Sequence, residues 1–216
     1  MGPPLADAAP AVETAAPSPE SEPHTGSGLR GSLALLGGAT AWDPRLDDYQ
    51  WSVTPHAAYG AQVLAGTNRY QGGIRGWRSQ SRQQIDPGSS TTETTVHATS
   101  LELVGRARLA SRWGTVVSAD VTGGWLRLGY SPDRAEVATG SGTVEVEFRP
   151  IDTWVAGFGF AFERSLGDSW SATLALDQRV FGLEAAHRNG STIEVGRERF
   201  LDWGARLELA KNWEWR

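Results

Sequence analysis

Apolar and charged residues alternate strictly along several segments of the chain. The clearest example is segment 143–149, TVEVEFR, in which apolar side chains occupy every second position and charged ones lie between them. Because successive side chains of a strand point to opposite faces, this segment predicts a strand with one apolar and one charged face. Similar alternation appears over 101–109, 170–179 and 203–209. A half-buried soluble sheet and a membrane-spanning sheet both fit the pattern, so alternation alone does not choose between them.

The pattern predicts an all-β protein made of antiparallel hairpins. Glycines, 26 in all, are scattered through the apolar runs, where each would cost a helix about 1 kcal/mol. The connections are too short for parallel crossovers, which need a dozen residues or more. Predicted strands cover residues 30–42, 51–65, 69–84, 94–110, 114–131, 136–149, 153–166, 169–183, 191–199 and 202–215, the last two being open to merging into one long strand.

The predicted connections alternate in length over most of the chain. Longer polar loops at 43–50, 86–92 and 132–135 alternate with short turns at 66–68, 111–113 and 150–152. Short turns at one rim and longer loops at the other are typical of membrane-spanning barrels. The compact connection 166–169 breaks the alternation, because a longer loop is expected there. Several predicted strands also exceed the usual five or six residues, whereas a tilted strand needs about 9 to 11 to cross a bilayer.

Tryptophan is abundant, and many of the ten copies lie near predicted strand ends. In a membrane barrel such residues form aromatic girdles at the two membrane interfaces. Packing in the core of a soluble sandwich is the alternative. The predicted girdle residues are Trp42, Trp51, Trp113, Trp154, Trp170, Trp203, Trp213 and Trp215.

The alternating strands, the tryptophans and the ending 207–215, LELAKNWEW, together resemble the small outer-membrane β-barrels of Gram-negative bacteria. The last strand of that class alternates apolar residues and finishes on an aromatic residue, whereas here Arg216 follows the aromatic. The resemblance covers residues 29–216. It implies an antiparallel up-and-down transmembrane β-barrel of 8–10 strands, located in the bacterial outer membrane and in contact with its lipid, including lipopolysaccharide.

The first 28 residues differ from the rest of the chain. They hold six of the eleven prolines and contain no Phe, Tyr, Trp, Lys or Arg. Such a segment buries too little apolar surface to fold, so we predict a disordered arm over 1–28 and a barrel over 29–216. The arm carries four of the five net negative charges, and the nearly neutral body predicts no nucleic-acid partner. No signal peptide is visible at Met1, and we interpret the chain as one from which the signal has been removed.

The polar faces of the predicted strands collect charges of both signs. A barrel of about eight strands is only wide enough inside to be filled by side chains, so we expect these charges to pair and plug the lumen. A narrow ion-selective pore lined by the same residues is the alternative. The predicted lumen residues are Glu102, Arg106, Arg108, Asp120, Glu145, Glu147, Arg149, Glu163, Asp177, Arg179, Arg206 and Glu208.

Residues that could carry catalysis or bind a metal are few. The chain has no cysteine, and its four histidines lack the spacing of zinc ligands, so no metal site and no cofactor is predicted. The places to look for a lipid-modifying or proteolytic site are His97 with Thr99 and Ser100, and His187 with Glu184. Neither set lies in a recognisable motif, and we predict no catalytic residues.

Basic and aromatic residues interleave at Arg75, Trp77, Arg78 and Arg82. This pattern would suit the phosphates of lipopolysaccharide or a glycan, but it favours long side chains that line the lumen or reach from the wall to the membrane surface.

We therefore predict a non-enzymatic outer-membrane barrel with a structural or interaction role in a bacterial envelope assembly. Its long loops or its N-terminal arm would contact other envelope proteins. One alternative is a soluble barrel or sandwich that binds a small apolar ligand or a glycan on its tryptophans. Another is a narrow pore or a lipid-modifying barrel enzyme.

Overall fold

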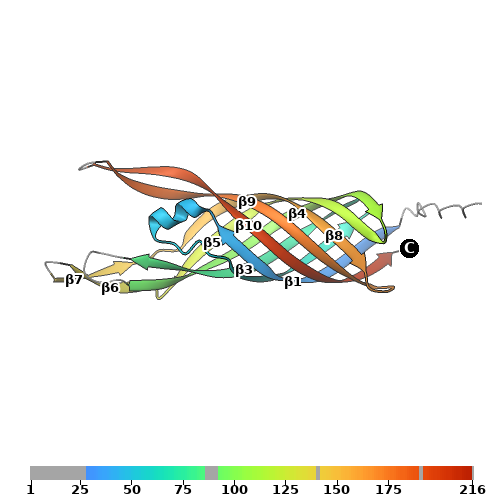
Figure 1. The fold of residues 1–216 in the computed structure, drawn as a ribbon, viewed down its shortest axis with the longest axis horizontal. Coiled ribbons are helices and arrows are strands. Elements are labelled where there is room, and N and C mark those ends of the chain that lie inside the picture. Colours follow the sequence, from blue (N-terminus) through green and yellow to red (C-terminus); the bar gives the residue numbers. More distant parts are fainter. Residues whose placement is uncertain (1–27, 86–91, 140–141, 190–191, 216) are drawn as a thin grey trace, which may run out of the picture.

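Eight long antiparallel strands close into a barrel (Figure 1). The computed structural model describes residues 28–85, 92–139, 142–189 and 192–215, so residues 1–27 of the predicted arm lie outside the described residues. The predicted up-and-down barrel of 8–10 strands is confirmed, with the order β1-β10-β9-β8-β5-β4-β3-β2 around the ring. The strands are β1 (Leu29–Trp42), β2 (His56–Gly66), β3 (Tyr70–Ile85), β4 (Thr92–Arg112), β5 (Thr115–Ser131), β6 (Arg134–Thr139), β7 (Gly142–Glu147), β8 (Ile151–Ser165), β9 (Trp170–Asn189) and β10 (Thr192–Trp215).

The first and last strands close the ring. β1 pairs with β10 along its whole length, from Leu29 opposite Trp215 to Trp42 opposite Asp202. A row of paired residues that starts at Asp152 on β8 runs once around the barrel and returns to β8 at Phe162, ten residues further on. This stagger tilts the strands against the barrel axis, by about 35–45° in barrels of this kind, and leaves an interior that side chains can fill.

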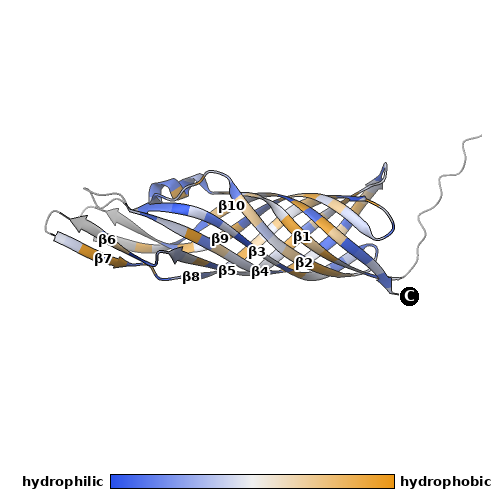
Figure 2. Ribbon diagram, turned by 90° about the horizontal axis from the view of Figure 1, so that it is seen from below, coloured by the Kyte–Doolittle hydropathy of each residue, from blue (hydrophilic) through white to orange (hydrophobic). Residues whose placement is uncertain are grey.

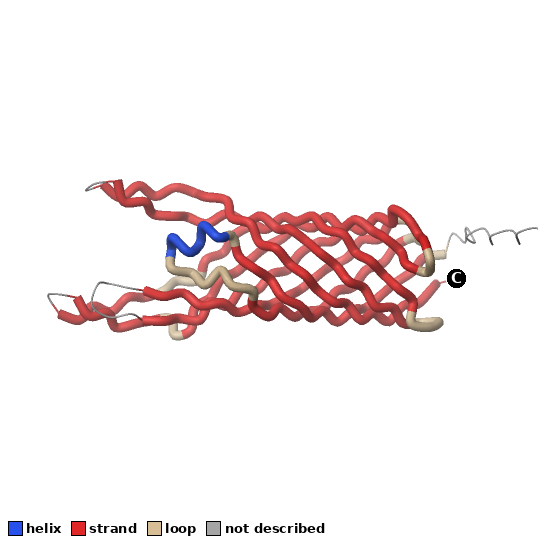
Figure 3. The backbone as a smooth tube through the Cα atoms, in the orientation of Figure 1, coloured by secondary structure: helices blue, strands red, loops and turns tan. Residues whose placement is uncertain are grey.

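The two ends of the barrel differ. Short turns at 67–69, 113–114 and 166–169 lie at one end, together with the start of β1 and the end of β10 (Figure 3). The other end carries the 3₁₀ helix η1 (Pro44–Tyr49), the β6–β7 hairpin and the projecting ends of β9 and β10. We call these the turn end and the loop end. The compact connection 166–169 is therefore a turn-end connection, where a short turn is expected.

The single barrel strand predicted over 136–149 is wrong. Its residues form the arms of the β6–β7 hairpin, which pairs from Arg134 opposite Glu147 to Thr139 opposite Gly142. This hairpin is a separate two-stranded sheet within the loop between β5 and β8. The predicted turn at 150–152 consequently lies at the loop end, where β8 begins. The segments predicted at 191–199 and 202–215 form one strand, β10.

The outer wall of the barrel is apolar. Large apolar side chains are exposed there to an extent that water would penalise, for example Leu35 at 67%, Leu103 at 69% and Leu207 at 65%. Figure 2 shows hydrophobic positions recurring along the barrel wall. This surface fits lipid and contradicts the soluble alternative. The apolar belt comprises Leu33, Leu35, Val63, Ile74, Leu101, Leu103, Val121, Phe158, Phe160, Phe162, Leu174, Leu176, Leu207 and Leu209.

Exposed tryptophans lie on both sides of the belt. On β10, Trp203 and Trp213 face outward ten residues apart, which matches the 9 to 11 residues that a tilted strand needs to cross a bilayer. The exposed tryptophans toward the loop end are Trp125, Trp154 and Trp203, and those at the turn end are Trp113, Trp170, Trp213 and Trp215. Trp125 was not among the predicted girdle residues.

Two of the predicted girdle residues lie inside the molecule. Trp42 is 2% exposed and Trp51 is 4% exposed, and both belong to the apolar core at the loop end. Trp42 has the same parity on β1 as the buried Ala34, Leu36 and Thr40, so it faces the lumen. Trp51 follows η1, which folds back over the barrel mouth. Within the described residues, no helix has the length and apolar character needed to cross a membrane.

A charge on the belt should destabilise the barrel in a lipid bilayer. Phe160 lies near the middle of the belt, so we expect Phe160→Arg to lower the free energy of unfolding by about 2–4 kcal/mol, as at a bilayer midplane. Urea unfolding of the protein in phospholipid vesicles measures this loss. Val144→Arg, on the exposed hairpin arm β7, is the control and should change little. Equal effects of the two substitutions would contradict a lipid-facing belt.

Candidate functional site

The lumen is filled by three successive layers of side chains. Along β4 the inward-facing residues run from Val96 and Ala98, through Glu102 and Arg106, to Arg108. Val96 and Ala98 belong to an apolar core at the loop end. Glu102 and Arg106 belong to a buried charged layer in the middle. Arg108 lines a polar cavity at the turn end. We call these the apolar plug, the charged layer and the turn-end cavity.

Asp120 on β5 is the centre of the charged layer. Arg106 donates to both of its carboxylate oxygens, at 2.8 and 2.9 Å. Arg75 and Arg206 donate to Oδ2 of the same carboxylate at 3.1 and 3.3 Å. Arginine suits this role because its planar guanidinium carries five donors and binds a carboxylate with two of them at once. Three strands, β3, β4 and β10, are thus tied to β5 through one acid.

Glu208 on β10 extends the layer across the lumen. It accepts from Arg106 at 3.2 Å and from Arg206 at 2.9 Å. Arg75 donates in addition to the side chain of Gln62 at 2.8 Å. The cationic side chains therefore have acceptors on several strands, which offsets the desolvation that isolated charges would suffer.

A second carboxylate centre lies closer to the plug. Glu102 accepts hydrogen bonds from the indole N–H of Trp77 and the hydroxyl of Ser100, both at 2.6 Å. Arg179 lies 3.9 Å from Glu102 and stacks over the Trp77 ring at 3.8 Å, a cation–π contact. Arg179 also pairs with Asp202, which in turn bonds Thr40 on β1.

Glycines make room for the acid that joins the two centres. Asp177 on β9 pairs with Arg206 and lies 3.5 Å from Arg179. Its cross-strand neighbours are Gly159 on β8 and Gly204 on β10. A Cβ at Gly159 would lie 2.9 Å from the Asp177 Cβ, and one at Gly204 would lie 3.0 Å from its Oδ2. Both neighbours must therefore lack side chains for the carboxylate to fit.

Seven of the twelve predicted lumen residues lie together in this charged layer: Glu102, Arg106, Asp120, Asp177, Arg179, Arg206 and Glu208. The predicted lumen set lacks Asp202 and also Arg75, for which a rim or lumen role was considered. Asp202 has the same parity on β10 as Arg206 and Glu208, so strand parity was enough to find it. Ile74 faces lipid, so the next residue on the strand, Arg75, faces the lumen by alternation.

Two predicted residues lie at the turn end and three lie outside the barrel. Arg108 and Glu163 line the turn-end cavity. Glu145 and Glu147 belong to β7, with side chains 60% and 56% exposed, and the Arg149 side chain that follows is 85% exposed. Their assignment to the lumen is wrong, because the hairpin projects into solvent, where charged side chains are equally well accommodated.

The apolar plug closes the loop end. Trp42, Phe181 and Phe200 contact one another edge-on or tilted, with ring centroids 5.1 Å apart for Trp42–Phe181 and 6.1 Å for Phe181–Phe200. Leu46 of η1 is 1% exposed and packs into the same cluster from above. Such burial stabilises by roughly 25 cal/mol per Å² of apolar surface, so the plug also anchors η1.

Asp43 fixes the helix that covers the plug. It accepts from the backbone N–H of Arg45 and of Leu201, at 3.0 and 2.9 Å, and from the Arg45 guanidinium. The hydrogen bond from the Arg45 side chain is the main reason why the pKa of Asp43 falls from 3.8 to about 2. One carboxylate therefore caps η1 and ties it to β10.

The turn-end cavity is polar and has a volume of about 180 Å³. That volume corresponds to several water molecules, at about 30 Å³ each. Its walls include Gln62, Ser118, Thr173 and Asn212, and it ends against Arg106 and Glu208 of the charged layer. Water can therefore enter from the turn end but meets paired charges and then the apolar plug.

The sites considered for catalysis are not assembled. His97 and Thr99 share the outward parity of Leu101 on β4, whereas Ser100 points into the lumen and donates to Glu102. The two faces of a strand hold these groups apart. Glu184 is exposed, and the side chain of His187 lies outside the described residues. No group of three His, Cys, Asp or Glu in the described part of the chain could hold a metal ion.

Solved structures share this architecture at low sequence identity. Neisserial surface protein A aligns with a TM-score of 0.52 at 7% identity, over 84% of this chain and 96% of that one. The outer membrane protein OprG from Pseudomonas aeruginosa aligns with a TM-score of 0.51 at 10% identity, over 85% and 96%. Outer membrane protein W of E. coli gives 0.50 at 12% identity, over 85% and 98%. No family model and no curated protein matches the chain.

The chain thus has the fold of the bacterial outer-membrane β-barrels, as its strand pattern predicts. The lipid-facing belt and the exposed tryptophans agree with that fold. An outer-membrane location is the one that the fold indicates, with the short turns toward the periplasm and the loop end outside.

Removing Arg106 should destabilise the barrel more than removing Arg108. Arg106→Met deprives Asp120 and Glu208 of a buried partner, so we expect a loss of about 3 kcal/mol in the free energy of unfolding. Arg108 has no ion-pair partner among the described residues, so Arg108→Met should cost under about 1 kcal/mol. Urea unfolding in vesicles compares the two. Equal losses would show that the charged layer does not stabilise the fold.

The cap of η1 should loosen in acid. Because the pKa of Asp43 is lowered in the folded state, its charge stabilises the cap above pH 3.8, and this contribution is lost as the pH falls toward 2. We expect amide hydrogen-exchange protection at Arg45 and Leu201 to decrease over that interval. Asp43→Ala, which removes the acceptor, should show low protection at both amides at all pH values. Unchanged protection down to pH 2 in the unsubstituted protein would contradict the role of this carboxylate.

Proposed function

We propose that this protein is a non-enzymatic, non-conducting outer-membrane barrel that serves as a structural or interaction component of the cell envelope. The observation that carries the proposal is the filled lumen. Buried charges are paired across its middle, and the apolar plug lies in series with them. An ion that entered from the turn end would have to break the charged layer and then cross a dehydrated apolar region.

The loop end offers the surface for contacts with other molecules. The β6–β7 hairpin and the ends of β9 and β10 project beyond the barrel (Figure 1). The hairpin exposes Val144 between Thr143 and Glu145, and β10 exposes Val195 and Arg197. A two-stranded sheet outside a barrel has unpaired edges, which are templates for strand addition. Envelope proteins that add a strand to this hairpin are the protein partners that we propose.

Lipid is the other partner. The belt supports contact with acyl chains, and we propose lipopolysaccharide as the glycolipid on the loop-end side. We further propose that the N-terminal arm, residues 1–28, contacts other envelope proteins in the periplasm.

The folded protein should not conduct ions. Because two layers close the lumen in series, planar bilayers containing the purified protein should show no stable conductance steps. Heat-dependent mobility on SDS gels and protease protection of the barrel in the same vesicles show whether the protein has folded and inserted. Reproducible ion-selective steps from inserted protein would favour the pore alternative over the closed barrel.

A further inference from the structure

An outward-facing row of residues crosses five strands on one side of the barrel. Tyr59 on β2 pairs with Arg78 on β3, which pairs with Thr99 on β4. Thr99 pairs with Arg127 on β5, which pairs with Asp152 on β8. Arg78, Thr99 and Arg127 are all exposed on the outer wall. Two arginines thus flank one hydroxyl across three neighbouring strands.

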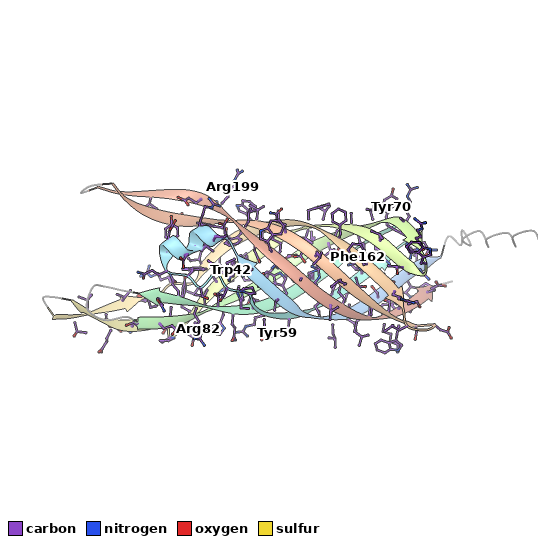
Figure 4. The ribbon with its side chains drawn as sticks, viewed as in Figure 1. Trp42, Tyr59, Tyr70, Arg82, Phe162 and Arg199 are labelled. Atoms are coloured by element: carbon purple, nitrogen blue, oxygen red, sulfur yellow. The ribbon has the colours of Figure 1, made fainter. Side chains whose placement is uncertain are left out.

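This row lies at the loop-end border of the apolar belt. Toward the turn end, the next outward residue on β4 is Leu101, which is 57% exposed, and the next on β5 is Trp125, which is 42% exposed. Trp125 belongs to the exposed tryptophans on the loop-end side. Arg78 and Arg127 therefore lie where the acyl chains of the outer leaflet end and the headgroups begin. Figure 4 shows the labelled Tyr59 and Arg82 on the same edge of the barrel, with Arg82 nearer the loop end.

The row carries more positive than negative charge. Arg78 has no ion-pair partner among the described residues. Arg127 lies 4.0 Å from Asp152, and both side chains are about half exposed, at 50% and 51%. The Arg127 guanidinium has five N–H donors, so most of them stay available to an anion on the side facing Thr99. Further from the membrane, Arg82 is already paired with Glu93 at 3.2 Å.

Exposed arginines at the loop end lie on both sides of the barrel, but at different distances from the belt. On β5 the first outward residue beyond Trp125 toward the loop end is Arg127. On β10 the first outward residue beyond Trp203 is Leu201, which is paired with Val180 on β9, and the exposed Arg199 follows one outward position further on. Arginine therefore lies directly at the belt border on the side of β3 and β5, which favours a localised ligand there.

We propose that Arg78 and Arg127 clamp a phosphate group of the outer-leaflet glycolipid, with the Thr99 hydroxyl as a third donor. The two arginines lie on strands separated by one other strand, about 10 Å apart at 4.7–4.9 Å per strand, a gap that two long side chains close around one phosphate. A phosphate that carries acyl chains fits better than a free one, because the belt lies directly below the clamp. This inference rests on the proposed function in requiring an embedded barrel with its loop end in the outer leaflet.

The test compares lipid A with and without its phosphates, and with another anionic phospholipid. Full-length protein in detergent is loaded with bisphosphorylated lipid A, with dephosphorylated lipid A or with phosphatidylglycerol, and the retained lipid is measured by native mass spectrometry. We expect the unsubstituted protein to prefer bisphosphorylated lipid A. Arg78→Gln and Arg127→Gln should each weaken its binding about fivefold, and the double variant about 25-fold. Arg164→Gln is the matched control, because Arg164 is an exposed outward arginine at the turn end of β8.

Each outcome decides the inference. Loss of lipid A binding in the double variant, but not in Arg164→Gln, supports the clamp. Equal binding of dephosphorylated lipid A overturns it, as does unchanged binding by the double variant. If phosphatidylglycerol binds as well as bisphosphorylated lipid A, the row is a general contact for anionic lipids, and the proposed clamp is also overturned. The conductance experiment tests the proposed function, and the lipid experiment tests the clamp. If the lipid experiment fails while the lumen does not conduct, the clamp is overturned and the proposed function stands.

Discussion

A polypeptide backbone inside a bilayer has no water to satisfy its N–H and C=O groups, so a membrane-spanning sheet must close on itself. Here β1 and β10 make that closure over the full length of β1. Closure leaves each strand only two sides, one toward lipid and one toward the lumen. The apolar belt and the charged interior both follow from this alternation. Because eight strands enclose little more space than side chains fill, the buried charges in the middle of the lumen pair with other side chains, most of them on other strands.

A few arginines provide most of these pairs, because one guanidinium can bind acids on more than one strand. Arg106 on β4 bonds acids on β5 and β10, and Arg179 on β9 contacts acids on β4 and β10. Several of these links join strands that are not neighbours in the sheet, so the charged layer ties the walls together across the lumen. These contacts replace a hydrophobic core in the middle of the barrel, and they are the basis of our proposal that the barrel does not conduct ions.

The two ends of the molecule have different physical tasks. The turn end admits water to a polar cavity, and its short connections leave little surface for a partner. At the loop end an apolar plug, capped by η1, closes the barrel beneath long projecting strands. The border of the apolar belt lies on the outside of the same end, so the protein and glycolipid contacts that we propose would lie close together.

The sequence by itself determined most of the strands and most of the charged layer, because the parity of a side chain along a strand is a local property. The closed barrel was implied only by the resemblance to outer-membrane barrels. Tertiary structure decided the rest. The alternation over 143–149 is the same for a barrel strand and for an exposed hairpin arm, and only the pairing of β6 with β7 distinguishes them. Trp42 lies in the plug because it has lumen-facing parity on β1, and Trp51 lies there because the segment with η1 folds back over the barrel mouth. Some pairs are local, such as Arg206 with Glu208 on the same strand. The pairs that cross the lumen, such as Arg106 with Glu208, were fixed only by the stagger of the closed ring, since those partners come from strands far apart in sequence.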